Sequence, residues 1–199
     1  MVFPMKSRRG AIRCGQLGYS LIEMVMTLAV GLILASVALP TMISAIQSYR
    51  LNSVSQQIAS LIELTRYTAI RHNSVIRSRT TPDNTVFFID VNGNGNLDPG
   101  EPMVMLPSDM QLANSQCPRP DPRTPGLAPG LVSTQDFAGQ ITFDYRGTVN
   151  FSAGASTAPY FLALSYANQA QYGCRAITVT SMGQTKLWKA PDKVHWTGM

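Results

Sequence analysis

Residues 18–49 read GYSLIEMVMTLAVGLILASVALPTMISAIQSY, and this stretch decides the fold. From Met24 to Tyr49 there are 26 residues without one charged side chain. About 20 apolar residues are enough to span the hydrocarbon core of a membrane as a helix. The stretch therefore predicts a membrane-spanning helix.

The net charge of +5 is concentrated ahead of this helix. Of the 16 Lys and Arg residues four precede Gly18, and these are Lys6, Arg8, Arg9 and Arg13. The part of the chain after Gly18 contains the other 12 basic residues and all 11 acidic residues, so its net charge is only +1. Because basic residues mark the cytoplasmic side of a membrane helix, we expect a cytoplasmic N-terminus and an exported C-terminal region. The basic character is a targeting signal and only weak support for nucleic-acid binding.

Gly18 precedes the apolar run, whereas an ordinary secretory signal has its cleavage site after the run. Cleavage after Gly18 would leave the membrane helix on the mature chain. A carboxylate at the edge of an apolar helix is energetically costly, so we expect Glu23 to have a partner. The alternative is a plain signal anchor that contains a glutamate by chance.

The motif Gly18-Tyr19-Ser20-Leu21-Ile22-Glu23 resembles the prepilin motif of type IV pilins and type II secretion pseudopilins. The resemblance extends to Pro40, where the family has a helix-kinking proline. It implies cleavage by prepilin peptidase after Gly18 and methylation of the new amino group of Tyr19, which stands where most members have phenylalanine. It also implies that Glu23 pairs with the free amine of a neighbouring subunit.

Three further segments resemble GspH/FimT-type minor pilins, and these are Leu64–Asn73, Asp90–Gly95 and Phe143–Gly147. The resemblance implies a minor pilin of a type IV pilus that helps to initiate assembly or sits at the tip. Its partners would be other pilins, contacted through the N-terminal helix. The alternatives are a type II secretion pseudopilin and a DNA-binding pilin in natural transformation.

After Pro40, apolar residues recur every three or four positions up to Ile62, as on one face of an amphipathic helix, and we expect the helix to end near His72. Beyond residue 73 the pattern changes to β-rich runs separated by turns. These runs are residues 75–76, 86–89, 103–106, 141–143, 160–164 and 176–180. The sequence therefore predicts an α+β pilin fold, with a long N-terminal helix packed on an antiparallel β-sheet.

Three segments follow from this plan. Residues 1–18 are the expected leader, residues 19–46 the half of the helix that lies in the membrane or the filament core, and residues 47–199 the exported pilin domain. We expect a single-pass inner-membrane protein with a periplasmic domain, which then enters a pilus or pseudopilus.

Residues 90–101 combine oxygen-bearing side chains with the spacing of an EF-hand loop. The candidate calcium ligands are Asp90, Asn92, Asn94, Asn96 through its carbonyl, Asp98 and Glu101. The flanking segments have strand patterns, so the loop is not part of an EF-hand. The alternative is a polar β-hairpin loop, because Asn, Gly and Asp are also the usual turn residues.

Two cysteines, Cys117 and Cys174, follow the predicted leader. An even pair in an exported chain predicts a disulfide, and the alternative is two unpaired buried thiols. The bond would close a loop that begins with the proline-rich segment 117–130. Such a segment cannot join the interior of a sheet, so we expect it on the surface.

A DNA-binding role would rest on the C-terminal region, where basic residues surround a tryptophan. The candidate residues are Arg175, Lys186, Trp188 and Lys189, with the cations on phosphates and the indole stacked on a base. The alternative is a set of solvated lysines. The sequence contains no Walker loop, Rossmann fingerprint or nucleophile elbow, so we predict no enzymatic activity, and calcium is the only cofactor that it suggests.

Overall fold

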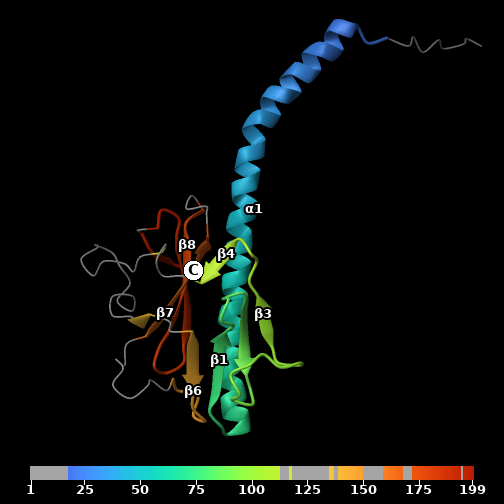
Figure 1. Cartoon of the computed structure of the whole chain (residues 1–199). Coiled ribbons are helices and arrows are strands. Elements are labelled where there is room, and N and C mark those ends of the chain that lie inside the picture. Colours follow the sequence, from blue (N-terminus) through green and yellow to red (C-terminus); the bar gives the residue numbers. More distant parts are fainter. Residues whose placement is uncertain are drawn as a thin grey trace, which may run out of the picture. The chain divides into compact units, whose positions relative to one another are not determined.

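The computed structural model of the chain describes residues 18–112, 117, 135–136, 139–149, 159–167, 172–193 and 195–199. The chain forms two compact units, Met1–Met42 and Ile43–Met199. One helix, α1 (Leu21–His72), contributes residues to both units (Figure 1). Except for Gly18, the predicted leader lies outside the described residues, as does most of the proline-rich segment.

In the first unit, α1 carries the apolar segment that the sequence predicts to span a membrane. Its length and composition are sufficient for a membrane crossing, and none of its apolar window is buried. Three hydroxyl groups donate to carbonyl oxygens three residues earlier: Thr27 to Met24 (2.9 Å), Ser36 to Ile33 (2.7 Å) and Thr41 to Ala38 (2.8 Å). These donors are satisfied inside the helix, as a hydrocarbon environment requires.

The C-terminus of α1 is fixed by a residue in the left-handed conformation. Asn73 has a φ of 48°, and the amide of Ser74 donates to the carbonyl of Ala69 at 3.2 Å. Asparagine tolerates this conformation better than most residues because its short polar side chain can bond locally. The predicted end of the helix near His72 is confirmed.

The second unit adds strands to the C-terminal part of α1. They are β1 (Ile76–Thr80), β2 (Val86–Asp90), β3 (Met103–Met105), β4 (Met110–Leu112), β5 (Gln135–Asp136), β6 (Gln140–Phe143), β7 (Tyr160–Tyr166), β8 (Cys174–Val179), β9 (Thr185–Ala190) and β10 (Thr197–Gly198). The described strands form two sheets, one in the order β3-β2-β1-β6 and one in the order β10-β9-β8-β7-β4 with β5 beside β7. Only the short β5–β7 pair is parallel among these pairings, so the predicted α+β plan of a long helix and antiparallel strands is confirmed.

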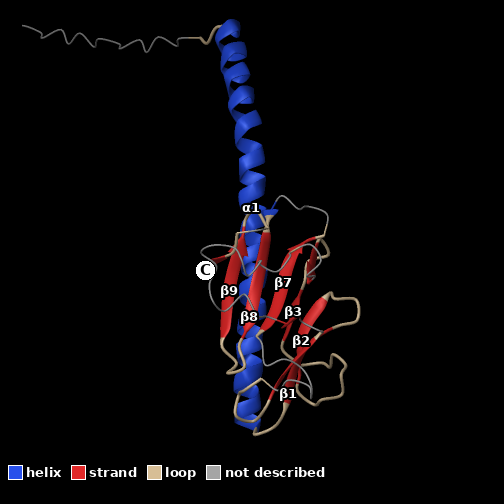
Figure 2. Ribbon diagram, turned by 90° about the vertical axis from the view of Figure 1, so that its left-hand side faces the viewer, coloured by secondary structure: helices blue, strands red, loops and turns tan. Residues whose placement is uncertain are grey.

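Both sheets lie along the C-terminal part of α1 and share one hydrophobic core with it (Figure 2). Residues without exposed surface include Leu51, Ile58 and Ile62 of the helix, Phe87 and Ile141 of the smaller sheet and Val179 of the larger one. Each such side chain stabilises the fold by roughly 1.5–3 kcal/mol relative to an exposed one. This burial holds both sheets on the helix.

The larger sheet also buries part of its second face. Cys117, Phe161, Cys174, Trp188 and Trp196 belong to a separate buried cluster there. The rings of Phe161 and Trp196 meet edge to face, with centroids 5.6 Å apart. Because successive strand residues point to opposite faces, β8 and β9 each supply one set of side chains to α1 and another to this cluster.

The apolar runs of the sequence indicated β1, β2, β3, β6, β7 and β8, but no such run indicated β4, β5, β9 or β10. In β9, the lysines at 186 and 189 interrupt the apolar residues, so the segment resembles a polar tail. Its strand conformation depends on pairing with β8, which aligns Ala176 with Trp188 and Ile177 with Leu187. Tertiary pairing therefore outweighs the weak local signal.

Gly183 in the β8–β9 turn offers a test of this packing. It has a φ of +72°, and a Cβ atom there would lie 2.6 Å from the carbonyl oxygen of Gly147. We expect Gly183→Ala to lower the free energy of unfolding by about 1–3 kcal/mol, because both backbone strain and a backbone clash result. Urea denaturation of residues 47–199 measures the change.

Gly100→Ala is the matched control. Gly100 has a φ of +95° but no heavy atom within 4 Å of the added Cβ. Gly100→Ala therefore incurs the conformational strain without the clash, and it should lower the free energy of unfolding by less than Gly183→Ala does. Equal losses in the two variants would show that the close approach at Gly183 has no energetic role.

Candidate functional site

The residues of the predicted processing and assembly motif belong to the first unit. Gly18 and Tyr19 precede α1, with Tyr19 77% exposed, and Glu23 lies exposed in the first helical turn. Pro40 lies inside α1, which continues through it although proline cannot donate the helical hydrogen bond. The exposure of Tyr19 and Glu23 leaves both accessible to a peptidase or to a neighbouring subunit. Their roles stay predictions.

The predicted calcium loop connects β2 to β3, and its glycines at 93 and 95 lie next to Arg77 and Arg79 of β1. Asp90 at the end of β2 is 1% exposed, and its Oδ2 lies 3.2 Å from Nε of Arg79. The amide of Gly95 donates to the same oxygen at 3.1 Å. The guanidinium thus already neutralises the carboxylate at the first position of the proposed ligand set.

The other candidate ligands are bonded within the loop. The side-chain amides of Asn92 and Asn94 both donate to Oδ2 of Asp98 at 2.6 Å, and Glu101 accepts from the amides of Val91 (2.9 Å) and Asp98 (3.1 Å). Asn92 and Asn94 also accept backbone amides, from Asn94 and Asn96 respectively. Within the described part of the chain no group of three or more His, Cys, Asp or Glu residues is arranged to hold a metal.

One buried oxygen still favours a ligand, because Oδ1 of Asp90 has no hydrogen-bond partner among the described residues. A hard cation prefers several converging oxygen atoms, whereas the side-chain oxygens of Asn92, Asn94 and Glu101 already accept hydrogen bonds within the loop. The arrangement fits a hydrogen-bonded hairpin loop better than a calcium site. Calcium binding stays a prediction that requires the loop to rearrange.

The hairpin and calcium-site interpretations differ in whether Asp90 needs calcium to stabilise the protein. If its partners are Arg79 and the Gly95 amide, Asp90→Asn should lower the free energy of unfolding by about 1–3 kcal/mol with EDTA and with calcium alike. Urea denaturation in both buffers measures this. Asp98→Asn is the control, with a smaller expected loss because its partners are neutral side chains. A loss that appears only with calcium would contradict the hairpin interpretation and support the metal site.

Cys117 and Cys174 are joined by a disulfide, and both residues are fully buried. Cys174 begins β8, so the bond ties the segment after β4 to the centre of the larger sheet. By the loop-entropy relation, closing a loop of this length contributes roughly 4 kcal/mol to stability. Residues 118–130 lie outside the described residues, and their surface position stays a prediction.

The structure divides the four predicted DNA-binding residues between the two faces of the larger sheet. Arg175 of β8 and Lys189 of β9 lie opposite each other in register, on the face that packs against α1. Lys186 and Trp188 lie on the other face, where Trp188 belongs to the buried disulfide cluster.

Two of the four are also buried, which keeps them from the backbone and bases of a long nucleic acid. Trp188 is 6% exposed and donates its indole N–H to Thr178 at 3.0 Å, so it presents no free face for stacking. Arg175 is 4% exposed and bonds to α1, and its burial lowers the pKa of the guanidinium. DNA binding stays a prediction, and it would have to rest on Lys186 and Lys189.

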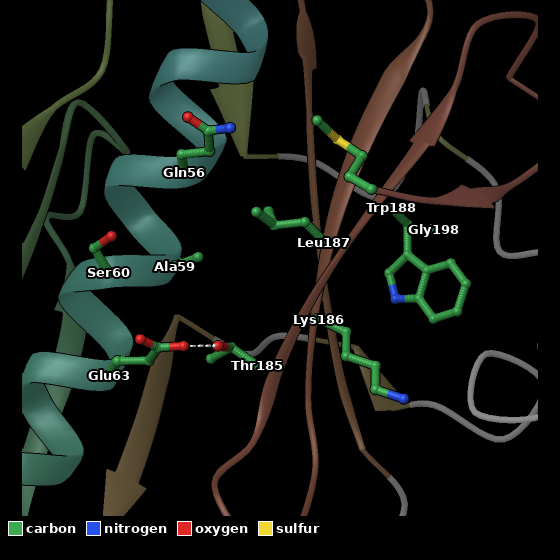
Figure 3. A pocket seen from close by; sticks show the side chains of 10 residues that line it. Gln56, Ala59, Ser60, Glu63, Thr185, Lys186, Leu187, Trp188 and Gly198 are labelled. Atoms are coloured by element: carbon green, nitrogen blue, oxygen red, sulfur yellow. Dashed lines mark hydrogen bonds between the residues drawn. The ribbon is translucent and has the colours of Figure 1, made fainter.

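A groove between α1 and β9, which no sequence pattern indicated, has a volume of about 700 Å³ (Figure 3). Thr185 and Leu187 point towards the helix, whereas Lys186 and Trp188 point away from it. Across the groove, the hydroxyl of Thr185 donates to the carboxylate of Glu63. The groove depends on β9 being a strand, so no local sequence signal could have identified it.

A family model described as "Type II transport protein GspH" matches residues 54–183, about two thirds of the chain. The chain therefore belongs to the GspH family, which makes it a pilin-like protein of the minor pilin and pseudopilin class. No curated protein sequence gives a significant match.

The solved structures that are similar to this chain include a minor pilin and a minor pseudopilin. The type IV minor pilin FimU of Pseudomonas aeruginosa is 13% identical over 77% of this chain and 95% of its own, with a TM-score of 0.47. The minor pseudopilin EpsH from the Type 2 Secretion System of Vibrio cholerae is 15% identical over 69% and 94%, with a TM-score of 0.42. At these values no residue role or partner can be transferred from either structure.

Proposed function

We propose that this chain is a minor pilin subunit of a type IV pilus. It is made as a precursor, cut between Gly18 and Tyr19 by prepilin peptidase and held in the inner membrane by residues 19–46. Its N-terminus faces the cytoplasm and residues 47–199 lie in the periplasm. It joins other pilins through α1 and helps to initiate assembly or occupies the filament tip.

One observation carries the proposal: the GspH-family match, residues 54–183, follows the first half of α1, whose apolar side chains are exposed. Leu21 is 82% exposed, Leu32 71% and Val37 70%. Contiguous apolar surface of this kind marks a membrane or an interaction partner. The same segment has to leave the membrane when a filament forms, and neighbouring apolar helices can then cover it.

Glu23 supplies the specific contact in this proposal. It is the single charged residue between Tyr19 and Tyr49, and it lies in the first turn of α1, where the helix dipole favours a negative charge. In a membrane or a filament core an unpaired carboxylate is unfavourable, so a neighbour's amino group offers both a counter-charge and a register.

The second candidate is a pseudopilin of a type II secretion system, and the description of the matching family model favours it. Both candidates use the same fold, anchor and processing. They differ in the machine that receives the subunit, so a phenotype is needed to distinguish them.

The N-terminus of the mature protein tests the processing step. We expect intact-mass and peptide mass spectrometry of membrane-extracted protein to show a chain that begins at a methylated Tyr19. Tyr19→Phe should be processed in the same way, because both residues place an aromatic ring after the cleavage site. A chain that retains Met1, or a cut at another position, would contradict the proposal.

Deletion of the gene tests the filament itself. We expect the deletion strain to lose surface pili but to keep protein secretion, and the wild-type gene to restore the pili. Glu23→Gln should leave the protein in the membrane yet reduce its recovery in sheared filaments at least tenfold, which corresponds to about 1.4 kcal/mol.

Tyr19→Phe is the matched control for Glu23→Gln, since it changes the same motif but keeps the carboxylate. Loss of secretion with intact pili would overturn the pilus assignment in favour of the pseudopilin. Normal recovery of Glu23→Gln in filaments would show that the carboxylate has no role in assembly.

A further inference from the structure

We propose that a cationic pocket in the second unit binds the phosphate group of an anionic phospholipid from the membrane that holds α1. Ser48 and Asn52 of α1, Arg175 of β8 and Lys189 of β9 line the pocket, whose volume is about 440 Å³. The inference rests on the proposed membrane anchorage, and it adds a ligand that the anchorage does not require.

Arg175 is a buried cation whose bonds, among the described residues, go only to uncharged acceptors. Its Nε donates to Oδ1 of Asn52, one terminal nitrogen to Oγ of Ser48 at 3.0 Å and the other to the carbonyl of Cys174 at 2.9 Å. A guanidinium has five N–H donors and stays protonated in proteins. A buried charge is normally paired with an opposite one, so this arginine lacks a counter-charge within the described part of the chain.

Lys189 adds a second positive charge at the pocket. It faces Arg175 across the β8–β9 pair, and its side chain is exposed. Among the described residues that line the pocket none is acidic. Two cations on a polar wall of hydroxyl and amide groups form a site for an anion, with Lys189 at the accessible edge and Arg175 below it. Arginine and lysine are the side chains that most often bind phosphate groups.

The position of Ser48 along α1 indicates where the anion comes from. A span of about 20 residues crosses the hydrocarbon core, so a span that starts at Met24 ends near Ile43. Ser48 follows five residues later, about 7 Å further at the helical rise of 1.5 Å per residue. The headgroup layer on each side of a membrane is roughly 5–8 Å thick, so Ser48 lies at its level.

The residues next to Ser48 fit the same level. Tyr49 is 74% exposed, and tyrosine is enriched where a membrane helix meets the headgroups. Arg50 is the first charged residue after Glu23. At this depth the most abundant anions are lipid phosphates, and a phosphate bound there would supply the counter-charge that Arg175 lacks.

The test measures lipid binding by the full-length protein purified in a nonionic detergent. Native mass spectrometry, with phosphatidylglycerol and phosphatidylcholine of the same acyl chains added separately, reports how much of each lipid is retained. We expect one phosphatidylglycerol per chain and no comparable retention of phosphatidylcholine. Lys189→Gln should weaken phosphatidylglycerol binding roughly tenfold, since a charge-assisted bond to the phosphate is lost.

Lys186→Gln is the matched control, because Lys186 is an exposed lysine on the same strand but on the opposite face. It should retain phosphatidylglycerol like the wild type. Arg175→Gln should also lose the lipid, and circular dichroism shows whether it folds. Lys189→Gln decides the question even if Arg175→Gln does not fold. Equal retention by Lys189→Gln and the wild type would overturn the proposal.

Other sources of the anion give different results. If inorganic phosphate at millimolar concentration displaces the lipid completely, the pocket is a free-phosphate site and the lipid proposal fails. It also fails if a co-purified pilin, in the absence of lipid, protects Lys189 but not Lys186 from amine acetylation, since the anion then belongs to a neighbouring subunit. Carbonate extraction separates the two proposals: a chain released from membranes contradicts the anchorage itself, whereas an anchored chain without phosphatidylglycerol selectivity contradicts only this inference.

Discussion

The fold depends on one face of the C-terminal part of α1, which has to hold both sheets at once. Leu51, Ile58 and Ile62 have no exposed surface there, and residues of both sheets pack against the same core. The apolar residues in the N-terminal part of the same helix are exposed within the described part of the chain. The two parts of α1 therefore differ in composition. The C-terminal part is amphipathic and is buried by the domain, whereas the N-terminal part is apolar on all faces and can be buried only by a membrane or other helices.

The fold could be predicted from the sequence where the signal is local. The apolar run after Glu23 predicts α1, and Asn73 is a residue type that suits its end. The strands β2, β7 and β8 are apolar runs because they are covered on both faces. β9 could not be predicted in this way, because its two lysines lie on opposite faces and only its pairing with β8 makes it a strand.

The candidate sites also differ in whether a local sequence signal identifies them. The motif from Gly18 to Glu23 is contiguous, so its residues could be found by spacing alone. Spacing also identified the loop after β2, but it could not show that Arg79 on β1 lies against Asp90. The contact of Arg175 with Ser48 joins residues 127 positions apart and has no sequence signature. The residues that a sequence identifies least well are those that the tertiary structure alone brings together.

Several basic side chains outside the leader support the fold. Arg79 pairs with Asp90, Nε of Arg66 donates to the carbonyl of Gly147 at 3.0 Å, and Arg175 bonds to α1. A count of lysines and arginines therefore overstates the charge available for long polyanions. What remains exposed on β9 is one lysine on each face.

The alternation of β9 makes the two faces of its sheet independently variable. Thr185, Leu187 and Lys189 face α1, whereas Lys186, Trp188 and Ala190 face the disulfide cluster. Of the even positions only Lys186 is exposed, because Trp188 and Ala190 are buried in the cluster. Substitutions at Lys186 can therefore alter the outer surface while the odd positions keep the contact with the helix. Related subunits can thus vary the exposed side chain of β9 without changing the contact of the strand with α1. A single-residue insertion would shift the strand and exchange the two sets of side chains.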